Sequence, residues 1–126
     1  MIYRYTILYV ADVPASLEFY QAAFGLQTGF LHETGYGELQ TGPTKLAFSS
    51  HAMMASIGKQ VATEPPDKPA FELAFEVADV TASLARAVKA GAVLVTPVTQ
   101  MPWGQTLAYV RTPDGTLVEL CTAVAN

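Results

Sequence analysis

Carboxylate side chains alternate with apolar ones in a short run near the middle of the chain. Glu72 and Glu76 occupy one side of this run. The intervening apolar positions are Phe71, Leu73, Phe75 and Val77. Because side chains alternate between the two faces of a β-strand, we expect the apolar set to pack on a core and the glutamates to face the other way. Carboxylates on one face attract cations and can ligate divalent metal ions, so the run indicates a site of one of these kinds.

The other reactive side chains form no catalytic motif. His32 and His51 stand alone, and each is interpreted as a surface or hydrogen-bonded residue. Cys121 is the only cysteine, so it forms no disulfide within the chain, which agrees with a reducing compartment. We find no serine-histidine-acid arrangement, glycine-rich phosphate loop or metal-type cysteine spacing.

Residues 10–17 recur almost unchanged at residues 77–84. Both segments read Val-Ala-Asp-Val-x-Ala-Ser-Leu, and they differ only where Pro14 is replaced by Thr81. Each segment follows an alternating apolar run and opens a helical pattern, so the chain is predicted to contain two copies of one supersecondary unit. A duplicated unit places equivalent side chains around a pseudo-twofold axis, and ligand sites tend to form between packed halves.

Each copy predicts the element order β-α-β-β-β. In the first copy we expect a helix from Asp12 or Val13 to about Phe24, ended by Gly25, and strands over residues 3–10, 27–32, 36–40 and 44–50. In the second we expect a helix from Asp79 to about Ala90, ended by Gly91, and strands over residues 70–77, 93–100, 105–111 and 116–122. The proline-containing stretch 51–69 connects the copies, with a short helical turn in residues 51–58.

The composition predicts one compact domain. The chain has 126 residues, of which 51% are hydrophobic and 14% charged, so it is not a disordered linker. The net charge of −4 without a basic run excludes nucleic acid as a partner. The first apolar stretch, residues 7–11, is too short for a signal core or a membrane span, so we expect no membrane association and a cytoplasmic protein.

Several motifs together resemble the vicinal oxygen chelate superfamily. They are the paired Val-Ala-Asp-Val segments, Phe19-Tyr20, Phe24-Gly25-Leu26, and the closing segment Thr112-Pro113-Asp114-Gly115-Thr116-Leu117-Val118-Glu119-Leu120. The superfamily includes glyoxalase I, extradiol dioxygenases, fosfomycin-resistance enzymes and bleomycin-resistance proteins. The resemblance implies an α+β fold of two tandem βαβββ modules that form a cup-shaped mixed sheet with helices on the outer face. We expect a single domain, 1–126, with module one at about 1–50, a linker at about 51–69 and module two at about 70–126.

In catalytic members of the superfamily, the resemblance implies a divalent metal held at four equivalent places. These lie early in the first strand and in the last strand of each module. Alignment on the two repeated segments maps the first-strand places to Tyr5 and Glu72, and alignment on the closing segment maps the last-strand places to Phe48 and Glu119. A catalytic metal usually needs three protein ligands, and a phenyl ring supplies none. A metal-free protein is therefore favoured, and the alternative is a divalent ion on Glu72 and Glu119, with Tyr5 or water completing the ligand set.

The expected cleft is aromatic and acidic, which suits a planar or cationic small molecule. The residues predicted to contact it are Tyr5, Ile7, Phe48, Glu72, Trp103 and Glu119. Trp103 lies in a Pro-Trp-Gly stretch similar to one in bleomycin-resistance proteins, and packing at a module or subunit interface is its alternative role. The alternative for the glutamates is pairing with Arg4, Arg86 or Arg111.

Two functional classes follow from the resemblance. One is a metal-free binding protein of the bleomycin-resistance type. The other is a metal-dependent lyase, isomerase or dioxygenase of the glyoxalase or extradiol dioxygenase type. A homodimer is expected in either case, because members of the superfamily commonly pair their sheets. The sequence leaves open the ligand, whether a reaction is catalysed, and whether the cleft lies within one chain or between two.

Overall fold

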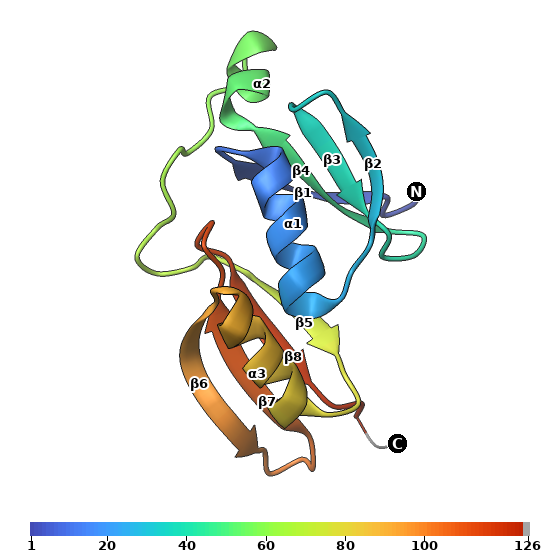
Figure 1. The fold of residues 1–126 in the computed structure, drawn as a ribbon, viewed down its shortest axis with the longest axis vertical. Helices are drawn as coiled ribbons and strands as arrows, with labels where there is room; N and C mark the ends of the chain where they lie inside the picture. Colours follow the sequence, from blue (N-terminus) through green and yellow to red (C-terminus); the bar gives the residue numbers. More distant parts are fainter. Residues whose placement is uncertain (125–126) are drawn as a thin grey trace. The chain divides into compact units, whose positions relative to one another are not determined.

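A computed structural model describes residues 1–124 of the chain. It divides into two compact units, Met1–Glu64 and Pro65–Asn126, called here the N-terminal and C-terminal units (Figure 1). Each unit carries the β-α-β-β-β order that the repeated segments predict, and the N-terminal unit adds a short helix. The α+β class and the two tandem βαβββ modules are thereby confirmed.

The N-terminal unit is a four-stranded mixed sheet in the order β1-β4-β3-β2. Strands β1 and β4 are parallel, and the other neighbours are antiparallel. Its elements are β1 Tyr5–Val10, α1 Val13–Phe24, β2 Thr28–His32, β3 Tyr36–Leu39, β4 Lys45–Ser50 and α2 His51–Ser56. The helical turn expected after residue 50 is the helix α2.

The C-terminal unit repeats this topology, with the order β5-β8-β7-β6 and a parallel pair β5 and β8. Its elements are β5 Glu72–Glu76, α3 Val80–Ala90, β6 Val93–Gln100, β7 Thr106–Arg111 and β8 Leu117–Cys121. All the strands expected from the sequence are present, with ends that differ by at most two residues from the expected ranges.

The two repeated aspartates begin the long helices. The side chain of Asp12 accepts a hydrogen bond from the backbone N–H of Ala15 at 3.1 Å, and Asp79 accepts one from Ala82 at 3.0 Å. Each aspartate thereby satisfies a backbone donor that has no partner within the helix. At the other end, α1 stops at Gly25, whose φ of 70° is in the left-handed region that favours glycine.

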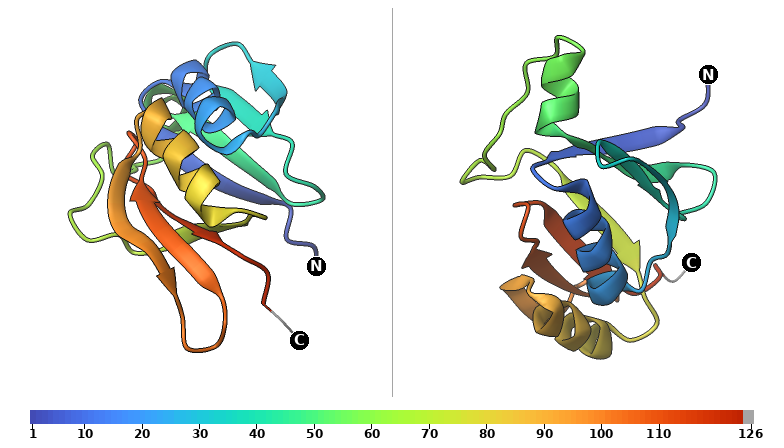
Figure 2. Two further views of the ribbon diagram at one scale, coloured as in Figure 1. Left: turned by 60° about the horizontal axis from the view of Figure 1, so that its bottom comes forward. Right: turned by 45° about the horizontal axis from the view of Figure 1, so that its top comes forward.

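In each unit, the long helix covers one face of the sheet and leaves the other face without a helix of that unit (Figure 2). The core lies between helix and sheet. In the N-terminal unit it contains Leu17 and Tyr20 of α1 with Leu39 and Phe48, all nearly or fully buried. The face of each sheet that points away from the unit's long helix is called the open face below.

A short segment before β5 is fastened to the C-terminal sheet. The Arg111 guanidinium donates hydrogen bonds to the carbonyl oxygens of Pro66, Asp67 and Gly115. Gly115 also lies directly against Pro65, where no side chain would fit. The chain therefore enters the C-terminal unit along a path fixed by the β7–β8 hairpin. Within residues 1–124, no helix combines the length and apolar character that crossing a membrane would require.

Candidate functional site

The open face of the N-terminal unit is aromatic and apolar along β1. Tyr5, Ile7 and Tyr9 are 48%, 41% and 42% exposed, whereas the alternating Leu8 and Val10 are buried on the helix side. Tyr5 and Ile7 thus lie together on the open face, in the orientation expected from the sequence.

Phe48 faces the opposite way, and its predicted orientation beside Tyr5 is wrong. Its side chain is fully buried and packs on Tyr20 of α1, with the ring centroids 4.9 Å apart. Its neighbour across the parallel pair is Leu8, which is also buried. Phe48 is therefore a core residue under α1.

Strand register gives the correct equivalent of Glu119 in the N-terminal unit. Glu119 is the partner of Ala74 in β5, and the position of β1 that corresponds to Ala74 is Ile7. The β4 partner of Ile7 is Ala47. A methyl group therefore occupies the place that the sequence alignment gave to a phenyl ring.

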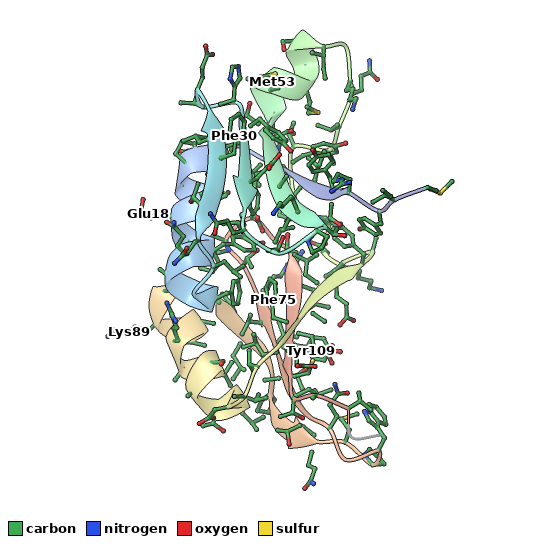
Figure 3. The ribbon with its side chains drawn as sticks, turned by 90° about the vertical axis from the view of Figure 1, so that its right-hand side faces the viewer. Glu18, Phe30, Met53, Phe75, Lys89 and Tyr109 are labelled. Carbon is green, nitrogen blue, oxygen red and sulfur yellow. The ribbon has the colours of Figure 1, made fainter. Side chains whose placement is uncertain are left out.

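The open face of the C-terminal unit places two carboxylates around a tyrosine. The hydroxyl of Tyr109 on β7 donates to Oε1 of Glu119 on β8 at 3.3 Å, and Tyr109 lies on the side of the sheet away from α3 (Figure 3). Burial, the charges of Glu119 and Glu72, and hydrogen bonding to both carboxylates raise the pKa of Tyr109 to about 12. The two predicted glutamates are thus brought together, and Tyr109 is a residue that sequence analysis missed.

A matching tyrosine and glutamate lie on the open face of the N-terminal unit. The Tyr36 hydroxyl donates to Oε2 of Glu38 at 2.8 Å, both on β3. Burial, together with the hydrogen bond and charge of Glu38, raises the pKa of Tyr36 well above its ordinary range. The ring of Phe30 lies 6.3 Å from that of Tyr36 and is stacked on His32 at 6.5 Å. The sequence pattern alone points to none of these side chains as site residues, and it predicts a surface or hydrogen-bonded role for His32.

Trp103 is held in a defined position in the loop between β6 and β7. Its indole Nε1 donates to Oε1 of Gln105 at 2.9 Å, and Nε2 of Gln105 donates to the carbonyl oxygen of Thr122 at 2.9 Å. The side chain is nevertheless 58% exposed, so the indole is available for contact. The loop turns at Gly104, whose φ is 95°.

Cys121 lies two positions along β8 from Glu119, on the same face of the strand. Burial, followed by the negative charges of Glu119 and Glu76, raises the pKa of the Cys121 thiol. A thiol that resists ionisation is a poor nucleophile and a poor metal ligand.

Two of the three arginines considered as partners for the glutamates are engaged with backbone groups. Arg111 donates to the three carbonyl oxygens described above, and Arg4 donates to the carbonyl oxygen of Pro43 at 3.5 Å. The carboxylate of Glu119 accepts the hydrogen bond from Tyr109 described above.

The donor set does not fit a catalytic metal ion. The four places carry the phenol of Tyr5, the methyl group of Ala47 and the carboxylates of Glu72 and Glu119, whereas a catalytic divalent site usually takes three strong ligands. Among the residues that the structure describes, no three His, Cys, Asp or Glu side chains gather where they could hold an ion. We therefore derive no chemical step through a metal.

Comparison with known proteins gives a family match across nearly the whole chain. The model of the glyoxalase/bleomycin resistance protein/dioxygenase superfamily matches residues 2–120. None of the curated proteins compared matches the chain.

Solved structures share the fold over most of their length. A glyoxalase-related enzyme from Fulvimarina pelagi is 27% identical with a TM-score of 0.81, and the match covers 95% of this chain and 86% of that chain. A glyoxalase/bleomycin resistance protein/dioxygenase family enzyme from Burkholderia phytofirmans PsJN is 21% identical with a TM-score of 0.80, covering 99% and 100%. A glyoxalase/bleomycin resistance protein/dioxygenase from Nocardioides is 19% identical with a TM-score of 0.80, covering 100% and 85%. At such identities the last two show the fold alone.

Proposed function

Because this chain belongs to the glyoxalase/bleomycin resistance protein/dioxygenase superfamily, we propose that it is a metal-independent small-molecule-binding protein for a planar or cationic ligand. The observation that carries the proposal is the meeting of Glu72 and Glu119 at the hydroxyl of Tyr109, on the open face of the C-terminal unit.

The charge state of this group supports binding of a cation. With a pKa of about 12, Tyr109 keeps its proton at neutral pH and donates its hydrogen bond to Glu119. A donor holds a carboxylate in place without cancelling its charge. Glu72 and Glu119 then offer concentrated negative charge to a ligand ammonium or other organic cation.

Aromatic side chains supply the complementary flat surface. The exposed indole of Trp103 can stack on a planar ligand, and its hydrogen bond to Gln105 fixes the position of the ring. Tyr5 and Ile7 offer a further apolar surface on the N-terminal unit. Phe48 is left out of the proposed contacts because it is buried under α1.

We also propose that the protein is a cytoplasmic homodimer. The exposed apolar side chains of β1 and β6 support a dimer, because burying such surface against a second copy removes it from water. The single, buried Cys121 is compatible with a reducing compartment.

The proposal is tested by titrating the protein with the planar cation thioflavin T while following the fluorescence of Trp103, the only tryptophan. We expect saturable quenching, and weaker binding by about tenfold in Glu119→Gln, since a hydrogen bond or ion pair to a charged group is lost. Glu18→Gln, on the exposed part of α1, is the matched control and leaves binding unchanged. An equal affinity for an uncharged planar analogue would contradict the proposed cation site.

Elemental analysis of protein purified without chelators tests metal independence. A divalent ion held at one per chain, and lost in Glu119→Gln, would overturn the metal-free proposal. It would support instead the metal-dependent lyase or dioxygenase alternative, in which Glu72 and Glu119 are ligands.

A further inference from the structure

The N-terminal unit contains a cavity of about 420 Å³ that is lined by residues of this unit. Its lining consists of Gly29, Glu38, Leu39, Gln40, Gly42 and Lys45. We infer that this cavity is a second binding site, and that it takes a zwitterion of amino-acid type, in which one ammonium and one carboxylate are joined to an apolar group.

Opposite charges on the cavity wall define the class of ligand. Glu38 on β3 provides a carboxylate and Lys45 on β4 an ammonium group, with the amide of Gln40 as an additional donor and acceptor. A lone cation would meet the charge of Lys45, and a lone anion would meet that of Glu38. A molecule that carries both charges satisfies both side chains.

Two glycines, Gly29 and Gly42, form part of the cavity wall. A Cβ atom on Gly29 would lie 3.1 Å from Cγ of Gln40, which is tighter than ordinary packing. The register of β2 and β3 shifts between Thr28 and Phe30, so Gly29 lies at a bulge. Gly42 has a φ of 98°, in the region that favours glycine, and open space where a side chain would be. Any larger residue at Gly29 would therefore intrude on the wall of the cavity.

The carboxylate end of the cavity borders an aromatic surface. Phe30 is the cross-strand partner of Glu38, and Tyr36 donates a hydrogen bond to Glu38. The rings of Phe30 and Tyr36 lie 6.3 Å apart. Ammonium groups bind favourably to aromatic faces as well as to carboxylates, so the ligand ammonium is assigned to this end and its carboxylate to Lys45.

The volume agrees with a small organic molecule. Small-molecule sites typically occupy about 300–1,000 Å³, so the cavity is at the small end of that range. A single amino acid fits within this volume. We name phenylalanine as the probe, because its ring matches the adjacent aromatic surface.

The test is calorimetry of the full chain with three related probes. They are phenylalanine, phenethylamine, which lacks the carboxylate, and 3-phenylpropionate, which lacks the ammonium. We expect phenylalanine to bind at least about tenfold more tightly than either analogue, because it makes both charged contacts. No heat of binding for phenylalanine at millimolar concentration would overturn the inference.

Two charge-removing variants assign the two ends. Glu38→Gln should weaken the binding of phenylalanine and phenethylamine about tenfold and leave the binding of 3-phenylpropionate unchanged. Lys45→Gln should weaken the binding of phenylalanine and 3-phenylpropionate about tenfold and leave the binding of phenethylamine unchanged. If Glu38 and Lys45 only pair with each other, both variants lower thermal stability and neither changes the affinity for one probe more than for the others. That result would contradict the inference.

Two further variants keep the test independent of folding defects and of the proposed function. Gly29→Val retains both charges but projects a larger side chain from the cavity wall, so it should abolish phenylalanine binding. Its far-UV circular dichroism spectrum should match that of the parent protein. Glu119→Gln should leave phenylalanine binding intact although it weakens the binding of thioflavin T. Loss of both probes together in Glu119→Gln would show that there is one site rather than two.

Discussion

The hydroxyl of Tyr109 and Oε1 of Glu119 lie 3.3 Å apart on adjacent strands, and Glu72 approaches the same hydroxyl from β5. Ionising Tyr109 would place a third negative charge beside two existing ones. The two carboxylates therefore favour the protonated form of the Tyr109 phenol, and this raises its pKa.

The first prediction concerns stability at high pH. The pKa of Tyr109 rises from 10.0 to about 12 on folding, so the folded chain holds this proton more tightly than the unfolded chain. The resulting stabilisation is complete below pH 10 and is lost as the pH rises to about 12. We expect urea denaturation to show a smaller loss of stability across this interval in Tyr109→Phe than in the parent protein.

A second variant separates the effect of charge from that of burial. Glu119→Gln removes the largest electrostatic contribution and should lower the pKa of Tyr109, as measured by tyrosinate absorbance. An identical high-pH stability profile in the parent and in Tyr109→Phe would contradict the assignment.

The second prediction concerns the core position of Phe48. Phe48→Ala should lower the free energy of unfolding by about 3–5 kcal/mol, because it leaves a cavity under α1 next to Tyr20. Tyr5→Ala, on the open face, is the matched control and should cost less than about 1 kcal/mol. Equal costs in urea denaturation would place Phe48 outside the core.

The third prediction uses two glycines of similar backbone geometry. Gly115 and Gly58 have φ values of 88° and 81°, but only Gly115 lies against another residue, Pro65. Gly58→Ala measures the backbone strain alone, about 1–2 kcal/mol. Gly115→Ala should cost more, and it should also displace the segment around Pro65.

Limited proteolysis measures that displacement. We expect faster cleavage near Pro65 in Gly115→Ala than in Gly58→Ala under the same conditions. The same rate in both variants would show that the contact with Pro65 does not hold the segment in place.

The fourth prediction concerns the duplicated helix starts. Asp12→Ala and Asp79→Ala should each destabilise by about 1 kcal/mol, because each removes an equivalent cap at the N-terminus of a long helix. Asp12→Asn and Asp79→Asn keep an oxygen acceptor and should recover most of the loss in thermal denaturation. A large difference between the two positions would contradict their structural equivalence.

The sequence predicts the order of the elements well because each carries its own local signal. Aspartate caps, glycine stops and alternating apolar runs are short-range features. Because the same features occur in both repeated units, the prediction for one unit supports the prediction for the other. Glu72 could likewise be placed on one face of its strand by alternation, whereas the place of Glu119 came from alignment on the closing segment.

The error at Phe48 arose from aligning turns instead of strands. The turn before β4 and the turn before β8 differ in conformation, so counting from them shifts the position by one residue, and a shift of one reverses the face of a strand. The pairing of Ile7 with Ala47 corrects it. Tyr109 was missed although counting back across the Pro113-Asp114-Gly115 turn would have brought it opposite Glu119.

Arg111 also determines which changes in chain length the molecule can accept. Its guanidinium fixes Pro66 and Asp67 close to the point where β5 begins. Insertions or deletions at residues 59–64 would therefore be absorbed before the chain reaches this anchor, and the location of Glu72 would not depend on them. Length variation on the other side of the anchor, between Asp67 and Glu72, would instead alter the register of β5 against β8 and turn the carboxylate away from Tyr109.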